Sequence, residues 1–136
     1  MRFVASYQDS GATKERLAKG ETVVAIDSGR LIGTITLAEA ALTRGSPLYD
    51  RADVASFGQF AVRPSHQGRG IGSRLLGLIE QRAQEKGVGE LALDTSEKAV
   101  QLIELYQAKG FRFVEYVEWR DTNYRSMVFS KKLKVV

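Results

Sequence analysis

A loop with three alternating glycines, placed between a strand-like run and an amphipathic helix, constrains the fold more than any other segment of this chain. The run Val54 to Val62 stops before Pro64, and Gly68, Gly70 and Gly72 lead into the helix. Backbone N–H groups at a helix start lack partners within the helix, and together with the helix dipole they favour an anion. Glycine permits positive φ and the close approach of a phosphate. The loop by itself indicates either a phosphate site or a tight turn without a ligand.

The other segments predict one α/β domain over residues 1–136. The helix after the loop has apolar residues at helical spacing and ends at Gly87, and a second helix is predicted from near Ser96 to Gly110. Strands are predicted at Thr22 to Ile26, Leu31 to Leu37, Val54 to Val62, Glu90 to Asp94, Arg112 to Trp119 and Tyr124 to Leu133, with a short helix at Asp9 to Lys19 and a long excursion over Ala38 to Asp53. This order predicts a mixed, mostly antiparallel twisted sheet flanked by helices.

The length and composition fit a small intracellular enzyme. The chain has no cysteine, which excludes disulfides, zinc–thiolate sites and thiol nucleophiles, and we expect no metal. Its net charge of +4 suits an anionic ligand but is too small and too scattered to indicate nucleic acid. Because no apolar run reaches the length of a membrane span and the start lacks a signal-peptide pattern, we expect a cytoplasmic location and no membrane partner.

The glycine spacing excludes the two commoner phosphate loops, since Ser73 breaks the G-x-G-x-x-G pattern and no lysine follows as in a P-loop. The remaining pattern, Gln67-x-x-Gly70-x-Gly72, resembles the acetyl-CoA signature Gln/Arg-x-x-Gly-x-Gly/Ala of the GNAT family of N-acetyltransferases. A second segment agrees downstream, where Leu105-Tyr106-Gln107-Ala108-Lys109-Gly110-Phe111 resembles the family's Leu-Tyr-x-x-x-Gly-Phe. The resemblance covers roughly Glu21 to Leu133 in the order of elements and is sharp between Phe60 and Phe111.

This resemblance implies the acyl-CoA N-acyltransferase fold, in an N-terminally short form, with acetyl-CoA as cosubstrate. It implies that the main chain of Phe60, Ala61 and Val62 pairs with the pantetheine amides, and that an N–H near Ala61 or Val62 polarises the thioester carbonyl. The pyrophosphate would lie on the loop and helix start, whose predicted contacts are Gln67, Gly68, Arg69, Gly70, Ile71, Gly72 and Ser73. His66 is expected at the surface or at the rim of the phosphate site.

Tyr106 has two interpretations. By helical spacing alone it is a core aromatic residue. By the resemblance it matches the tyrosine that many family members use as general acid, because a phenol within hydrogen-bond reach can protonate the coenzyme A thiolate as it leaves.

Three departures from the family pattern affect the predicted site. Only Met1 to Tyr7 can form the first strand, so this strand is expected to be short, or absent and rebuilt by a partner subunit, and the open edge motivates a homodimer. The segment Ala55 to Gln59 lacks the glutamate base of some members, which leaves Glu39 and Asp53 as weaker candidates and no base assigned. Ala99 stands where many members have a cofactor-binding asparagine.

The sequence therefore predicts an N-acetyltransferase that moves an acetyl group from acetyl-CoA to a primary amine of a small molecule or peptide by direct attack, with Tyr106 as general acid. Two other classes stay open: an acyl-CoA-binding sensor or structural subunit without turnover, and a protein for another anionic ligand such as a nucleotide. The acceptor is open among metabolites, antibiotics, polyamines and protein N-termini. Trp119 and Asn123–Tyr124 either line its pocket or serve as an interface or core aromatic and a turn.

Overall fold

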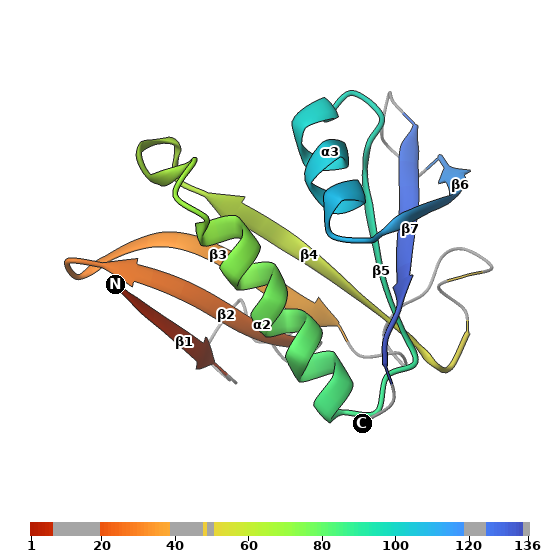
Figure 1. Ribbon diagram of the computed structural model, residues 1–136, viewed down its shortest axis with the longest axis horizontal. Helices are drawn as coiled ribbons and strands as arrows, with labels where there is room; N and C mark the ends of the chain where they lie inside the picture. Colours follow the sequence, from red (N-terminus) through yellow and green to blue (C-terminus); the bar gives the residue numbers. More distant parts are fainter. Residues whose placement is uncertain (7–19, 39–47, 49–50, 119–124, 135–136) are drawn as a thin grey trace.

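A computed structural model describes residues 1–6, 20–38, 48, 51–118 and 125–134. Over these ranges the chain forms a seven-stranded sheet and two α-helices (Figure 1). The elements are β1 (Arg2–Ser6), β2 (Gly20–Asp27), β3 (Arg30–Ala38), β4 (Val54–Val62), a 3₁₀ turn η3 (Pro64–His66), α2 (Ile71–Glu85), β5 (Glu90–Ser96), α3 (Val100–Ala108), β6 (Arg112–Val117) and β7 (Ser126–Lys132). None of the helices in the described part of the chain is long and apolar enough to cross a membrane.

The sheet is mixed, with strand order β1-β2-β3-β4-β5-β7-β6. Every neighbouring pair is antiparallel except β4 and β5, which run parallel and pair only from Val54–Ser56 to Glu90–Ala92. Beyond Ser56 the two strands diverge, as Figure 1 shows. The predicted mixed, mostly antiparallel sheet is therefore confirmed, and it contains a gap between two central strands.

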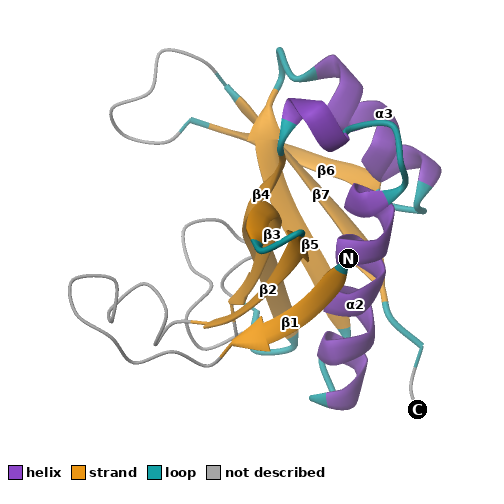
Figure 2. Ribbon diagram, turned by 90° about the vertical axis from the view of Figure 1, so that its left-hand side faces the viewer, coloured by secondary structure: helices purple, strands orange, loops and turns teal. Residues whose placement is uncertain are grey.

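Both described helices cover the same face of the sheet (Figure 2). The helix α2 lies across β2, β3 and β4, because its apolar stripe at helical spacing gives it one continuous buried side. The main core forms between the helices and this face, with fully buried Ile35, Leu75, Ile79, Leu91 and Phe129 among its members. A smaller cluster of Leu48, Val54, Ala92 and Val128 packs on the opposite face.

The first strand is where the sequence prediction needs correction. Residues Arg2–Ser6 form β1 and pair antiparallel with β2 over Thr22–Ile26, so this chain provides the strand itself and a partner subunit is not needed for it. A second correction concerns Ser96, which was predicted to begin a helix. Ser96 ends β5 instead, and its Oγ accepts a hydrogen bond from the Lys98 N–H (3.1 Å) in a turn before α3 begins at Val100. The helix predicted at 9–19 and most of the excursion at 38–53 lie outside the described residues.

Candidate active site

The glycine loop lies at the N-terminus of α2, where the sequence predicted it. Gly68 and Gly70 have φ of 80° and 79°, a backbone conformation that side-chain-bearing residues rarely adopt. A Cβ built on either glycine meets nothing within 4 Å, so both positions open onto free space. Gly70 is the N-cap of α2 and no side chain caps this end, which leaves N–H groups of the first turn for a ligand.

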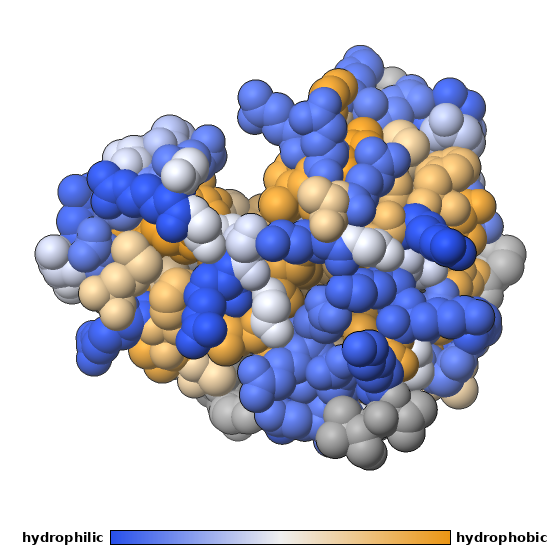
Figure 3. All heavy atoms as spheres, in the orientation of Figure 1, coloured by the Kyte–Doolittle hydropathy of each residue, from blue (hydrophilic) through white to orange (hydrophobic). Residues whose placement is uncertain are grey.

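Gly72 has a different constraint, because a Cβ there would lie 3.3 Å from the Phe60 Cζ atom, which is closer than most Cβ contacts. The glycine thus lets the Phe60 ring of β4 approach the start of α2. This contact brings the end of β4 and the glycine loop to opposite sides of one cavity. In the space-filling view the molecule is hollowed between the loop and α3, with hydrophobic atoms along the hollow (Figure 3).

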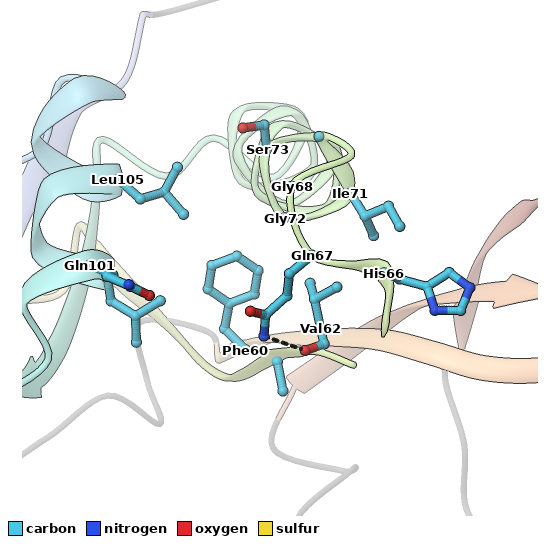
Figure 4. Close-up of a pocket in the computed structure, with 13 residues that line it drawn as sticks. Phe60, Val62, His66, Gln67, Gly68, Ile71, Gly72, Ser73, Gln101 and Leu105 are labelled. Atoms are coloured by element: carbon cyan, nitrogen blue, oxygen red, sulfur yellow. Dashed lines mark hydrogen bonds between the residues drawn. The ribbon is translucent and has the colours of Figure 1, made fainter. Parts of the chain in front are cut away.

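This first cavity has a volume of about 550 Å³ and contains most of the predicted cofactor residues. Its lining comes from Phe60, Ala61, Val62, His66, Gln67, Gly68, Gly70, Ile71, Gly72, Ser73, Gln101, Leu102 and Leu105 (Figure 4). Of the predicted contacts, Arg69 alone is not part of the lining; it is exposed in the loop. The sequence analysis missed Gln101 and Leu102, which lie on the turn of α3 that faces the cavity, because no motif identifies these positions.

Two side chains fix the loop between β4 and α2. Gln67 Nε2 donates a hydrogen bond to the Val62 carbonyl (3.0 Å), so the first residue of the signature holds the loop against the strand (Figure 4). His66 Nε2 lies 3.0 Å from Asp27 Oδ2, and its Nδ1 lies 2.8 Å from Ser65 Oγ. This hydrogen bond with His66 is the main cause that lowers the pKa of Asp27. His66 therefore has a carboxylate partner, 39 residues earlier, that local sequence could not reveal.

A bulge in β4 changes the direction of the strand beside the cavity. The partners of β3 skip from Gly58 to Ala61, so Gln59 and Phe60 together stand opposite one residue. Gln59 has φ of 51°, which is uncommon for a residue with a side chain. The Thr36 hydroxyl donates a hydrogen bond to Gln59 Oε1 (3.3 Å), and the buried Thr22 and Thr36 hydroxyls are 2.9 Å apart. This chain of hydrogen bonds holds the bulge from across the sheet.

A second cavity of about 500 Å³ lies where β4 and β5 diverge. Its lining consists of Thr34, Phe57, Gly58, Gln59, Phe60, Ala61, Leu93, Asp94, Thr95, Leu102 and Tyr106. Phe60, Ala61 and Leu102 line both cavities, so the two spaces adjoin at these residues. The predicted catalytic residue and the predicted cofactor residues thus belong to neighbouring cavities.

Tyr106 is a core aromatic residue that also lines the second cavity. Its side chain is 4% exposed, and its ring packs against Phe57, Phe60 and Phe111 at centroid distances of 5.9, 6.2 and 6.2 Å. Burial, with a smaller contribution from the charge of Asp94, raises the pKa of Tyr106 to about 12. The phenol is therefore protonated at any physiological pH and has a proton to donate.

Asp94 is the carboxylate that the sequence analysis missed. It is an exposed residue that follows the buried run Leu91–Leu93 and lines the second cavity. The signal was its place near the carboxyl end of a parallel strand, where ligands of α/β sheets commonly bind. The earlier candidate Asp53 lies at neither cavity and is paired with Arg51 (2.8 Å), while Glu39, Trp119 and Asn123–Tyr124 fall outside the described residues.

The first cavity has features suited to a ligand that carries an anionic group and amides. Its loop end offers an uncapped helix start and two glycines that leave room for a close ligand. Its other end is formed by β4, whose residues from Phe57 on are not paired with β5. A strand edge of this kind can accept hydrogen bonds from a ligand amide, as in peptide addition to a sheet. No group of three His, Asp or Glu in the described ranges is arranged to hold a metal ion.

Comparison with known proteins identifies the family. The sequence model of the Acetyltransferase (GNAT) family matches residues 2–111. S-(2-succino)cysteine N-acetyltransferase from Bacillus subtilis (strain 168) is 30% identical over 113 residues, which are 82% of this chain and 66% of that relative, just under two thirds of its length.

Solved structures agree in fold. The IAA acetyltransferase from Bacillus cereus ATCC 14579 has a TM-score of 0.70 at 21% identity, covering 97% of this chain and 100% of that protein. YncA from Salmonella typhimurium, solved with its cofactor acetyl-CoA, has a TM-score of 0.70 at 18% identity, covering 96% of this chain and 79% of that protein. At such identities the likeness concerns the fold, whereas the family match extends over most of the sequence. The chain belongs to the GNAT family of acetyltransferases.

Proposed function

We propose that this protein is an N-acetyltransferase that moves the acetyl group of acetyl-CoA to a primary amine of a small molecule or peptide. The observation that carries the proposal is the junction of the two cavities at Phe60, Ala61 and Leu102. One cavity begins at a helix start suited to an anion, and the other contains a protonated phenol and a carboxylate. An acetyl donor in the first cavity and an amine acceptor in the second would meet at the gap between β4 and β5.

In this proposal main-chain groups hold the acetyl donor, acetyl-CoA. The N–H groups of the glycine loop and the first turn of α2 bind the pyrophosphate, and Gln67 keeps the loop in place through Val62. The main chain of β4 after the bulge pairs with the pantetheine amides. A main-chain N–H near Ala61 or Val62 then donates to the thioester oxygen; removing one such donor typically costs about 3 kcal/mol in the activation barrier.

Two side chains, Asp94 and Tyr106, take part in the proton transfers of the proposed reaction. Asp94 attracts the acceptor ammonium and takes one of its protons, directly or through water. The neutral nitrogen attacks the carbonyl carbon, the C–N bond forms, and the C–S bond breaks with its electron pair on sulfur. The nitrogen, which is positively charged after the attack, loses its second proton, and the thiolate receives a proton, so the products are a neutral amide and the free thiol of coenzyme A.

The high pKa of Tyr106 defines its part in this sequence. A phenol with a pKa of about 12 is roughly 3.5 units less acidic than an ordinary thiol. Complete proton transfer to sulfur would therefore leave a strongly basic phenolate. Tyr106 thus donates a hydrogen bond as charge develops on sulfur and passes its proton while it regains one from the acceptor side through Asp94 or water.

The test is a screen for acetyl-CoA-dependent thiol release over a broad amine panel, with the acetylated product identified by mass. Because the chain contains no cysteine, a thiol reagent reports only coenzyme A. Release with at least one primary amine, and formation of its amide, is the expected result. Tight binding of acetyl-CoA by calorimetry without transfer to any amine would instead indicate a sensor or structural subunit. Displacement of coenzyme A by ATP or NAD would indicate a nucleotide-binding protein.

A homodimer and a cytoplasmic location stay predictions. The reason first given for the dimer, an open edge at β2, no longer applies because β1 pairs with that edge. Light scattering at high protein concentration tests the dimer, and a monomer there would contradict it.

A further inference from the structure

Gln59 lines the second cavity with a strained backbone. Its φ of 51° lies in the left-handed region, which glycine adopts without strain, although the glycine of this segment stands one position earlier, at Gly58. Strain of this kind persists only where the surrounding structure holds it, and it gathers at functional sites. The side chain of Gln59 therefore needs an explanation, because a glycine at this position would form the bulge more readily.

Two buried hydroxyl groups hold the Gln59 side chain from within the sheet. Thr36 Oγ1 donates a hydrogen bond to Gln59 Oε1 (3.3 Å) and lies 2.9 Å from the Oγ1 atom of Thr22. Thr22 and Thr36 are only 8% and 9% exposed, so the chain of hydrogen bonds that orients the amide is itself well fixed. Because Thr36 engages the amide oxygen, the donors that this side chain offers to a ligand are the two N–H groups of Nε2.

Gln59 and Tyr106 reach the second cavity from opposite faces of the sheet. Ile35 belongs to the core between the sheet and the helices, so its neighbours in β3, Thr34 and Thr36, point to the other face, because side chains alternate along a strand. The hydrogen bond with Thr36 places the Gln59 amide on that face too. Tyr106 belongs to α3, on the face that the helices cover (Figure 2). The cavity thus has a phenol on one side and, on the other, the amide of Gln59 and the hydroxyl of Thr34.

We propose that Gln59 binds the acceptor, through a hydrogen bond from Nε2 to an oxygen near the acceptor's amino group. The inference rests on the proposed acetyl transfer. Gln59 directly precedes Phe60 and Ala61, which line both cavities, so an oxygen bound at Gln59 lies only a few bonds from an amine that attacks at the junction. The substrate class that meets this condition is an amine with a carbonyl oxygen close by, as in aminoacyl compounds and peptide N-termini.

The same hydrogen bond gives a reason for the rejection of simple alkylamines. An alkylamine that fills the cavity displaces water from Nε2 and supplies no oxygen in its place, so the N–H donors of Gln59 stay unpaired. A site built to donate a hydrogen bond discriminates against analogues without the accepting atom more strongly than an apolar wall discriminates by size. Gln59 is therefore expected to determine specificity for the acceptor and not for acetyl-CoA, since it is not part of the lining of the first cavity.

The first test compares acceptors that differ only in an oxygen-bearing group. The methyl esters of alanine, leucine and phenylalanine are paired with ethylamine, isopentylamine and phenethylamine, which lack the ester. An ester carbonyl accepts hydrogen bonds and donates none, so it reports on a donor in the protein. We expect kcat/KM of each ester to exceed that of its partner by at least about tenfold.

Two variants remove the donor in different ways. Gln59→Gly removes the side chain and relieves the positive φ, so the unfolding temperature should stay near that of the wild type while KM for the esters rises about tenfold. Gln59→Glu keeps an oxygen for Thr36 but has no N–H when ionised, and it should lower the ester-to-alkylamine ratio of kcat/KM by about tenfold. The paired acceptors also differ in basicity, but this difference is the same for every variant and cancels when the ratios are compared.

The matched control is Gln107→Glu. Gln107 is exposed on α3 and is not part of either described cavity lining, so the same change of charge should leave the ratio unchanged. Calorimetry should give the wild-type Kd for acetyl-CoA in all three variants. A fall in the ratio for Gln107→Glu equal to that for Gln59→Glu would contradict a role of Gln59 in binding the acceptor.

The remaining outcomes separate this inference from the proposed function. Alkylamines that are as efficient as the esters, or turnover confined to amines without an accepting oxygen, would overturn the acceptor class and leave acetyl transfer intact. An unchanged ratio in folded Gln59→Gly and Gln59→Glu proteins would also overturn the inference. Absence of thiol release with every amine in the broad panel would remove the proposed function and this inference together.

Discussion

A glutamate at Gly70 should weaken the binding of acetyl-CoA strongly, by two separable effects. The first is conformational, because Gly70 has φ of 79° and a side-chain-bearing residue in this left-handed region costs about 1–2 kcal/mol. No steric clash is added, since a Cβ at Gly70 meets nothing within 4 Å. The conformational cost falls on folding and on the shape of the loop, and Gly70→Ala measures it alone.

The second effect is electrostatic and acts on the ligand. A carboxylate about 6 Å from one phosphate charge costs about 3 kcal/mol at an effective dielectric constant near 20. Gly70 is exposed, so screening reduces this figure, and about 2 kcal/mol is a fair lower estimate for the two phosphates together. That value corresponds to a Kd raised roughly 30-fold by charge alone.

The control is Gly77→Glu. Gly77 lies within α2 with a Cβ direction that meets nothing within 4 Å, and it is exposed outside the cavity lining. The Gly77→Glu substitution changes the net charge by the same amount as Gly70→Glu but lies outside the glycine loop. Titration calorimetry with coenzyme A should give wild-type affinity for Gly77→Glu, a modest loss for Gly70→Ala and a Kd raised at least about 30-fold for Gly70→Glu. Equal Kd values for Gly70→Glu and Gly77→Glu would refute the assignment of the loop to the pyrophosphate.

Three further predictions concern other parts of the fold. Tyr106→Phe should lower kcat by about 10²-fold at unchanged acetyl-CoA affinity. Because the pKa of Tyr106 is about 12, the kcat of the wild type should show no loss from this group below about pH 10. Full turnover by a folded variant would make Tyr106 only a core residue. Thr36→Val should lower kcat about tenfold with little change in the Kd of coenzyme A, because the bulge at Gln59 loses its hydrogen bond; equal losses in kcat and affinity would contradict a role in positioning the thioester. Glu21→Gln should lower the free energy of unfolding by about 2–3 kcal/mol, because buried Glu21 accepts hydrogen bonds from Arg82 (2.6 and 3.0 Å) and Lys86 (2.8 Å). These bonds, that of Arg82 foremost, lower the pKa of Glu21, so its contribution is complete above about pH 4.5 and is lost as the pH falls through the lowered value; urea unfolding of both proteins at pH 7 and pH 4 should show the difference shrink in acid.

The elements around the site were predictable because their signals are local. The stripe of α2 has apolar residues at helical spacing, and the glycines that precede it can only be explained by a turn with positive φ or a close approach. The two motifs then located Phe60 to Ser73 and Tyr106. Each of these inferences uses residues within one or two turns of each other.

What could not be predicted depends on strand register. Asp94 faces the same cavity as Tyr106 only because β4 and β5 separate after Ser56. The partner of His66 lies 39 residues earlier, across the β2–β3 hairpin. The bulge at Gln59 follows from a skipped pairing with β3 and has no sequence signal of its own. Likewise, β1 is a strand because β2 offers it an edge, not because its five residues form a strong pattern.

The common wall of the two cavities has a consequence for the kinetics of the enzyme. Phe60, Ala61 and Leu102, which line both spaces, have no side-chain nucleophile that could store the acetyl group after the first product leaves. Within the proposed function, we expect donor and acceptor to be bound together before either product departs. Double-reciprocal plots at several fixed amine concentrations should intersect, and free coenzyme A should not exchange label with acetyl-CoA when the amine is left out. Parallel lines would mean that a covalent acetyl-enzyme forms elsewhere on the chain.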